Sequence, residues 1–219
     1  MRFLKTDLLF IVSTIFSVTF GATQFVGLLS SINGINLSWL MLWQGFMAFN
    51  VMLAYGACRS AAKVAGPEGD HKRRISRQVL FGYSLGFLLN GSNLILLISR
   101  GASFREVDHT TFIAAGLGLL LVLAMYWKNL LDPMAKGWYA LLCKAVPQVL
   151  LAVSFWQVGG SAMPLVTLIA GHGIIVTRLI PIFVSYLKQK DPHTRGLLLS
   201  EGSNEASWLL VTLAWATTR

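Results

Sequence analysis

The sequence predicts an all-α integral membrane protein with seven transmembrane helices, and three observations support this fold class. Of the 219 residues, 55% are hydrophobic and only 12% are charged, whereas about 25% of a typical soluble domain is charged. The apolar residues gather in long runs, and a bilayer core of about 30 Å requires about 20 of them per helical crossing. Most Lys and Arg residues lie between the runs, which number seven: 8–29, 37–58, 78–99, 110–127, 137–157, 162–187 and 206–218.

Charged or turn-forming residues mark the ends of most of the apolar runs. The first run follows Arg2 and Lys5, the second opens after Asn33 and Gly34, and the third follows a strongly charged stretch. The fourth, fifth and sixth runs lie between short segments rich in charged residues or glycine. The seventh run is the shortest. It is long enough to cross the membrane only if its helix also includes the preceding residues 196–205, which contain Glu201 and Glu205.

Basic residues predict the orientation, since cytoplasmic loops collect Lys and Arg. Most of the 18 Lys and Arg residues precede the first run or lie in the loops on the same side as it. We therefore expect a multi-pass membrane protein with a cytoplasmic N-terminus and a C-terminus on the other side. Topology then explains the net charge of +9, and no nucleic-acid partner is expected.

The chain also shows signs of an internal repeat. A shift of 126 positions places Gly45 on Gly171, and the connections that follow the first and fifth runs lack charged residues. Two three-helix units in the same orientation need a single spacer helix between them, because the spacer restores the direction of the chain. We expect a first three-helix repeat at 1–105, a linker transmembrane helix at 106–132 and a second three-helix repeat at 133–219.

The second half carries Pro147 and Gln148 with Gly160 and Ser161 after them, and the first half carries Gln24 with the stretches 34–41 and 54–56. With the repeat, these positions resemble the PQ-loop repeat superfamily, which includes the SWEET sugar facilitators and the cystinosin-type amino-acid exporters. The resemblance implies a pore between two three-helix bundles that opens alternately to each side, with substrate bound near the midplane.

The resemblance also implies hinges in the first helix of each repeat. Pro147 is the best candidate, because a proline inside a helix removes one backbone hydrogen bond and permits a kink. Gln24 and Gln148 mark the two hinge positions, although Thr23 stands where the family has its other proline. Family members are described with an extracellular or luminal N-terminus, opposite to the orientation that the charges predict here.

Three ionisable residues, Lys144, His172 and Arg178, lie inside the predicted runs. Each would cost about 2.5–3.5 kcal/mol at a helix centre, so each is a candidate for a functional site. The runs contain no Asp or Glu, and we therefore expect no internal counter-ion and no proton coupling through a membrane carboxylate. The two cations would face water, extend to the head groups or bind an anion. His172 would either titrate near neutral pH or pack against a neighbouring helix.

Neutral polar and aromatic side chains favour a sugar instead. The amides of Asn50, Asn90 and Asn93 can donate to and accept from hydroxyl groups, and the indole of Trp208 can stack on a sugar ring. The resemblance to SWEET proteins implies an asparagine in the third helix of each repeat, which Asn90 or Asn93 would match. Each of these side chains could equally bond a neighbouring helix.

We therefore expect a membrane carrier for a small polar metabolite, preferably a sugar, that works by alternating access. Two alternatives stay open: a carrier of small organic anions that uses Lys144 and Arg178, and a receptor or assembly subunit of the same fold that does not transport. An enzyme is not expected, because the sequence contains no phosphate-binding glycine loop, metal-ligand spacing or nucleophile elbow. The expected partners are the lipid bilayer and a small-molecule substrate, with no cofactor and no metal, and a monomer would suffice to form the pore.

Overall fold

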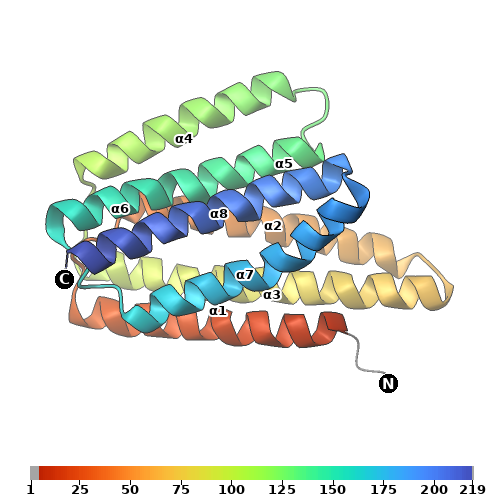
Figure 1. Ribbon diagram of the computed structural model, residues 1–219, viewed down its shortest axis with the longest axis horizontal. Helices are drawn as coiled ribbons and strands as arrows, with labels where there is room; N and C mark the ends of the chain where they lie inside the picture. Colours follow the sequence, from red (N-terminus) through yellow and green to blue (C-terminus); the bar gives the residue numbers. More distant parts are fainter. Residues whose placement is uncertain (1–4, 219) are drawn as a thin grey trace.

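The computed structural model describes residues 5–218, which form helices and no strands (Figure 1). Helices α5 and α6 are joined without a break by η1, one wide turn of π-helix, so the described part of the chain has seven long helices, and the predicted all-helical fold class is confirmed. The elements are α1 (Lys5–Ser30), α2 (Leu37–Ala62), α3 (Gly66–Ser99), α4 (Glu106–Met125), α5 (Pro133–Ala140), η1 (Leu141–Ala145), α6 (Val146–Val158), α7 (Leu165–Gln189) and α8 (Pro192–Thr217).

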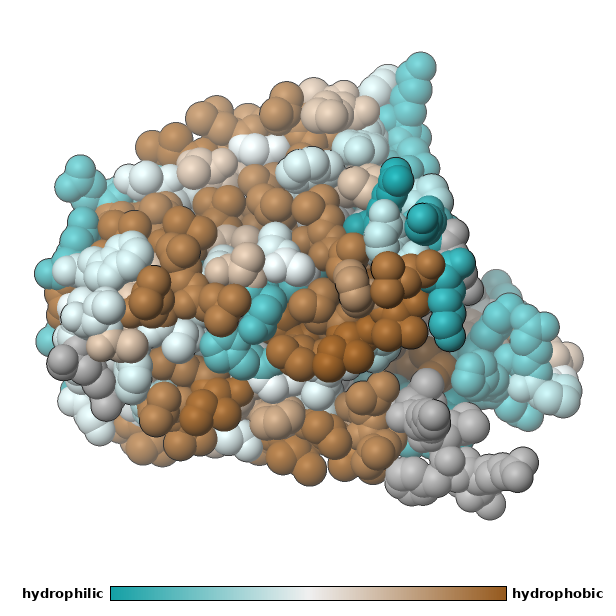
Figure 2. All heavy atoms as spheres, viewed as in Figure 1, coloured by the Kyte–Doolittle hydropathy of each residue, from teal (hydrophilic) through white to brown (hydrophobic). Residues whose placement is uncertain are grey.

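Six of the seven long helices have the length and hydropathy of a membrane span: α1, α2, α3, α4, the continuous helix α5–η1–α6, and α7. Large apolar side chains such as Ile15, Ile95 and Leu120 are exposed on their outer surfaces. Hydrophobic residues cover most of one face of the molecule, and hydrophilic residues gather toward its two ends (Figure 2). These features are those of a multi-pass integral membrane protein.

Helix α8 corrects two predictions. It begins at Pro192, well before the predicted run 206–218, and it contains both Glu201 and Glu205. The prediction that no carboxylate lies inside the helices was therefore wrong. Asp191 caps the helix by accepting a hydrogen bond from the Thr194 backbone at 3.0 Å, and the hydrogen bond from the Thr194 side chain is the main reason why the pKa of Asp191 is lowered.

The helices pack in two groups of three. In the first group α3 lies beside both α1 and α2, and in the second α8 lies beside both α7 and the continuous helix α5–η1–α6. We call these groups the first and the second triplet. Helix α4 lies on the outside of the bundle, against α2, α5 and α6 (Figure 1).

The two triplets touch closely at one end, which we call the tight end; it holds the α1–α2 and α6–α7 connections. Gly34 has a φ of +87°, and any side chain there would collide with the carbonyl oxygen of Gly159. Arg105, just before α4, joins the triplets by donating to Asn36 Oδ1 at 2.6 Å and to Ser154 Oγ at 2.9 Å. Buried apolar side chains from both triplets complete this closure.

The opposite end, which we call the basic end, holds the start of α1 and the α2–α3, α4–α5 and α7–α8 connections. Toward it α7, which contains Pro181, diverges from α1 (Figure 1). Several basic side chains here are paired within the chain: Arg74 with the buried Asp7, and Lys72 with Glu68 at 2.7 Å. The triplets thus separate at the basic end and close at the tight end.

Candidate functional site

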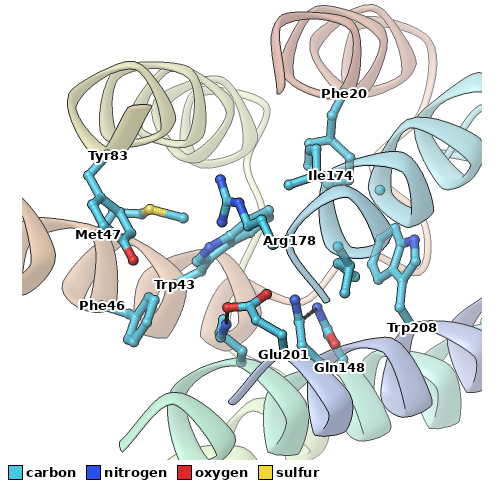
Figure 3. A pocket seen from close by; sticks show the side chains of 14 residues that line it. Phe20, Trp43, Phe46, Met47, Tyr83, Gln148, Ile174, Arg178, Glu201 and Trp208 are labelled. Atoms are coloured by element: carbon cyan, nitrogen blue, oxygen red, sulfur yellow. Dashed lines mark hydrogen bonds and ion pairs between the residues drawn. The ribbon is translucent and has the colours of Figure 1, made fainter. Parts of the chain in front are cut away.

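A cavity lies between the two triplets, and we call it the central cavity (Figure 3). It contains about 450 Å³ of space not filled by atoms, including open space at its mouth. Both triplets contribute to its walls. The lining residues from the first are Phe20, Trp43, Phe46, Met47 and Tyr83, and those from the second include Lys144, Gln148, Arg178, Glu201, Asn204 and Trp208.

Lys144 enters the central cavity from the π-helical turn η1. Its Nζ donates to Glu201 Oε1 at 2.9 Å and to Ser200 Oγ at 3.1 Å, and it lies 5.2 Å from the centre of the Phe46 ring. Both members of the ion pair are buried, with side chains 6% and 11% exposed. Lys144 therefore has the internal counter-ion that the sequence analysis did not expect.

Pro147 is the second residue of α6, which begins directly after η1. A proline cannot donate the backbone hydrogen bond of a regular helix and its ring crowds the preceding turn, and a wide π turn is a common way to accommodate such a defect. The next residue, Gln148, donates to Asn204 Oδ1 at 3.0 Å and accepts from Ser207. The predicted hinge residues Pro147 and Gln148 thus lie where the backbone is irregular and where α6 is bonded to α8.

Gln24, the predicted counterpart in the first triplet, lies in a different setting. It is buried near the tight end and donates to the carbonyl oxygen of Ala162 at 3.3 Å. Its neighbour Thr23 contacts Thr167 through a hydroxyl pair at 2.8 Å. Gln24 therefore joins the two triplets and does not line the central cavity.

Arg178 of α7 is the second cation that lines the cavity, and Trp43 and Glu201 line the same cavity (Figure 3). Within residues 5–218 Arg178 has no hydrogen bond or ion pair. Two other polar atoms of the lining are buried without a hydrogen-bond partner: Trp43 Nε1 and Glu201 Oε2. Buried polar atoms normally have partners, so Trp43 Nε1 and Glu201 Oε2, together with the half-buried guanidinium of Arg178, mark the place where a ligand or water would bind.

Two further pockets lie next to the central cavity, toward the basic end. One lies between α2, α5 and α8 and includes Asn50; the other lies between α1, α3 and α7 and has about 1370 Å³ of unfilled space, open solvent included. Both share Tyr83 and Glu201 with the central cavity, and the second also shares Arg178. The unfilled space between the helices is therefore concentrated on the side of the basic end.

The asparagines predicted to bind a sugar bond neighbouring helices instead. Asn90 donates to the Leu40 carbonyl at 3.0 Å and to Gln44 at 2.7 Å, and Asn93 donates to the Gly21 carbonyl at 3.3 Å. Both line an adjacent pocket with the same unfilled volume, about 450 Å³, which shares Trp43 and Arg178 with the central cavity. The Oδ1 atom of each asparagine is buried without a hydrogen-bond partner. Asn50 donates along its own helix to the Phe46 carbonyl at 2.8 Å.

Two other candidates have structural contacts. Trp208 does line the central cavity, but its Nε1 donates to the Leu168 carbonyl at 3.1 Å and its ring stacks on Trp39. His172 lies where α7 meets α8, with Nδ1 2.7 Å from Glu205 Oε1 and Nε2 2.9 Å from Thr212 Oγ1. It is not among the residues that line the cavity.

The sequence analysis did not select Glu201, Trp43 or Tyr83. A signal for Glu201 was present, since polar residues recur at 200, 201, 204 and 207 with the spacing of one helix face. Trp43 and Tyr83 lie among many apolar residues of their helices and carry no such signal. Among the described residues no group of three or more His, Cys, Asp or Glu is placed to hold a metal ion.

Comparison with known proteins identifies no relative. No protein-family model matches the chain, and no curated protein or solved structure is similar to it. The resemblance to the PQ-loop superfamily therefore remains a hypothesis based on the residues quoted above, and the function is argued from the cavity alone.

Proposed function

We propose that this protein is a membrane carrier for a small organic anion and that it works by alternating access between the two triplets. The observation that carries the proposal is the state of Arg178. Its guanidinium lines the central cavity without a hydrogen bond or ion pair in the described chain; its charge acts on Glu201, but that carboxylate is paired with Lys144. A cation held at this depth favours an anionic ligand, because an unpaired charge is costly away from water.

The contacts between the triplets support two repeats in the same orientation. Gln24 bonds the carbonyl of Ala162, and Asn36 bonds the carbonyl of Leu150. A shift of 126 positions converts residue 24 into 150 and residue 36 into 162, so the two contacts exchange under the shift that places Gly45 on Gly171, which is two positions longer than the shift that places Gln24 on Gln148. Such reciprocity is expected when two similar units pack around a pseudo-two-fold axis.

The difference between the two ends supports alternating access. A carrier exposes its site to one side at a time, and here the pockets at the basic end meet the central cavity while the backbones touch at the tight end. With the orientation predicted from the charges, the site would face the cytoplasm. The reverse state requires the contacts between Arg105, Asn36 and Ser154 to separate.

An anion fits the cavity better than the sugar that the sequence analysis preferred. The amides of Asn90 and Asn93 are engaged with backbone carbonyls outside the cavity, and the indole N–H of Trp208 is engaged as well. Three charged side chains, Lys144, Arg178 and Glu201, are among the residues that line the cavity, and a neutral sugar would leave Arg178 without an ion-pair partner.

Uptake into proteoliposomes tests the proposal. The purified chain is reconstituted and supplied with labelled propionate and labelled glucose in parallel, with empty liposomes and the Asn90→Ala variant as controls. We expect saturable propionate uptake, no glucose uptake above background and little effect of Asn90→Ala. Glucose uptake that requires Asn90 would favour the sugar carrier, and saturable binding of propionate without uptake would favour a receptor of the same fold.

A further inference from the structure

We propose that the ligand of the central cavity is a monoanionic 2-hydroxycarboxylate, bound through its carboxylate by Arg178 and Trp43 and through its hydroxyl by Glu201. The inference rests on the proposed function and names its substrate class. It follows from three polar groups without partners and from the charge balance of the cavity.

The carboxylate is assigned to Arg178 and Trp43 because both present N–H donors without acceptors. A guanidinium is planar and offers parallel donors that match the two oxygens of a carboxylate. Trp43 Nε1 is a donor only, and it is buried without a partner. Arg178, Trp43 and Glu201 line the same cavity (Figure 3), so a single ligand bound there can contact all three.

The hydroxyl is assigned to Glu201 because one oxygen of this carboxylate lacks a donor. Oε1 accepts from Lys144 at 2.9 Å and from Ser200 at 3.3 Å, whereas Oε2 is buried without a partner. A buried acceptor without a donor is unfavourable. A ligand that satisfies it must carry a hydrogen-bond donor close to the carboxylate held by Arg178, which places the donor on the adjacent carbon.

The charge balance decides between a hydroxyl and an ammonium as that donor. Three charged side chains line the central cavity: Lys144 and Arg178 are cationic, and Glu201 is anionic. The excess of one positive charge is neutralised by a ligand with a net charge of −1. A 2-hydroxycarboxylate has that charge, whereas a 2-amino acid is neutral overall and leaves the excess charge buried.

The walls of the cavity favour a short ligand. Aromatic rings of Phe46, Trp43, Tyr83 and Trp208 surround the charged groups, and the unfilled space is about 450 Å³ with the mouth included. Sites for small molecules typically combine a few polar groups with a mostly apolar lining. The rings can contact a short apolar substituent while the charged groups hold the acid.

Binding of three acids with the same carbon skeleton tests the inference. Labelled L-lactate is bound to the purified full-length protein in nanodiscs of neutral lipid, and L-lactate, propionate and L-alanine compete for it. We expect lactate to bind at least about tenfold more tightly than propionate, because a hydrogen bond to a charged group has about this effect. Alanine should bind more weakly than lactate by a similar factor.

Two variants assign the contacts. Glu201→Gln removes the charge that accepts the hydroxyl, and we expect the ratio of lactate to propionate affinity to fall toward one while propionate still binds. Trp43→Phe removes only the N–H donor and should weaken lactate and propionate by the same factor of about five to ten. Trp156→Phe is the matched control, because that indole is exposed and bonds Thr217 far from the cavity.

The possible outcomes separate the inference from the proposed function. Equal affinities for lactate and propionate would overturn the hydroxyl contact and leave the anion carrier standing. Alanine binding as tightly as lactate would overturn the charge argument. Absence of binding by all three acids, together with absence of propionate uptake, would overturn the proposed function itself. If the Glu201→Gln variant does not fold, the ratio of lactate to propionate affinity in the unmodified protein still tests the hydroxyl contact.

Discussion

Replacement of Arg178 by glutamine is expected to abolish propionate uptake and to weaken its binding by a factor of about 30 or more. Truncating one partner of a charge pair in a binding site costs about 2–5 kcal/mol, and Arg178 is the cation of the cavity lining that forms no ion pair or hydrogen bond in the described chain. Uptake by proteoliposomes and competition binding in nanodiscs measure the effect.

The matched control for this variant is Arg195→Gln. Arg195 lies near the start of α8 and is exposed, so its loss removes the same charge without touching the cavity. Uptake by Arg195→Gln should equal that of the unmodified protein. Unchanged uptake by a correctly folded Arg178→Gln variant would contradict the proposed anion site.

Separation of the buried pair Lys144–Glu201 is expected to cause the largest loss of stability. Replacing either partner alone, as in Lys144→Met or Glu201→Gln, leaves a buried charge or polar group without its partner, which costs about 3–5 kcal/mol. The double variant should recover much of this loss, so the pair should show strong coupling in a double-mutant cycle. Chemical denaturation in mixed micelles measures the free energy of unfolding.

The exposed pair Lys72–Glu68 provides the comparison. Its side chains are 54% and 76% exposed, and exposed ion pairs contribute only about 0–1 kcal/mol. Lys72→Met should therefore have little effect on unfolding. Additive effects of the two single variants at Lys144 and Glu201 would show that the buried pair does not act as a unit.

The apolar runs predicted most of the fold because a bilayer imposes its thickness on each crossing. The prediction was wrong for α8, where carboxylates interrupt the pattern. Glu201 is tolerated inside that helix because Lys144, from another helix, forms an ion pair with it. The hydropathy of a single segment cannot predict such a pair, because the pair depends on how the helices pack. The repeat and the orientation of the chain stay predictions.

The sequence predicted the two cations of the site but not its other residues. Lys144 and Arg178 stood out because charge is rare inside apolar runs. The role of an amide is harder to predict from the sequence, since Asn90 and Asn93 can each bond a ligand or a backbone carbonyl. Which of the two partners the amide bonds depends on the position of the neighbouring helix. The wide turn before Pro147 likewise reflects local packing, although the proline itself marked the place.

Alternating access is tested most directly by closing the tight end covalently. Ser31 and Ser161 belong to different triplets, and their hydroxyl oxygens are 3.0 Å apart, so cysteines at both positions are placed for a disulfide. In a background where the two native cysteines, both free of disulfides, are replaced by alanine, we expect oxidation of Ser31→Cys/Ser161→Cys to abolish propionate uptake and a reductant to restore it. The single-cysteine variants should transport under both conditions. Full uptake by the cross-linked protein would contradict the account, because a carrier cannot work with the triplets locked at one end.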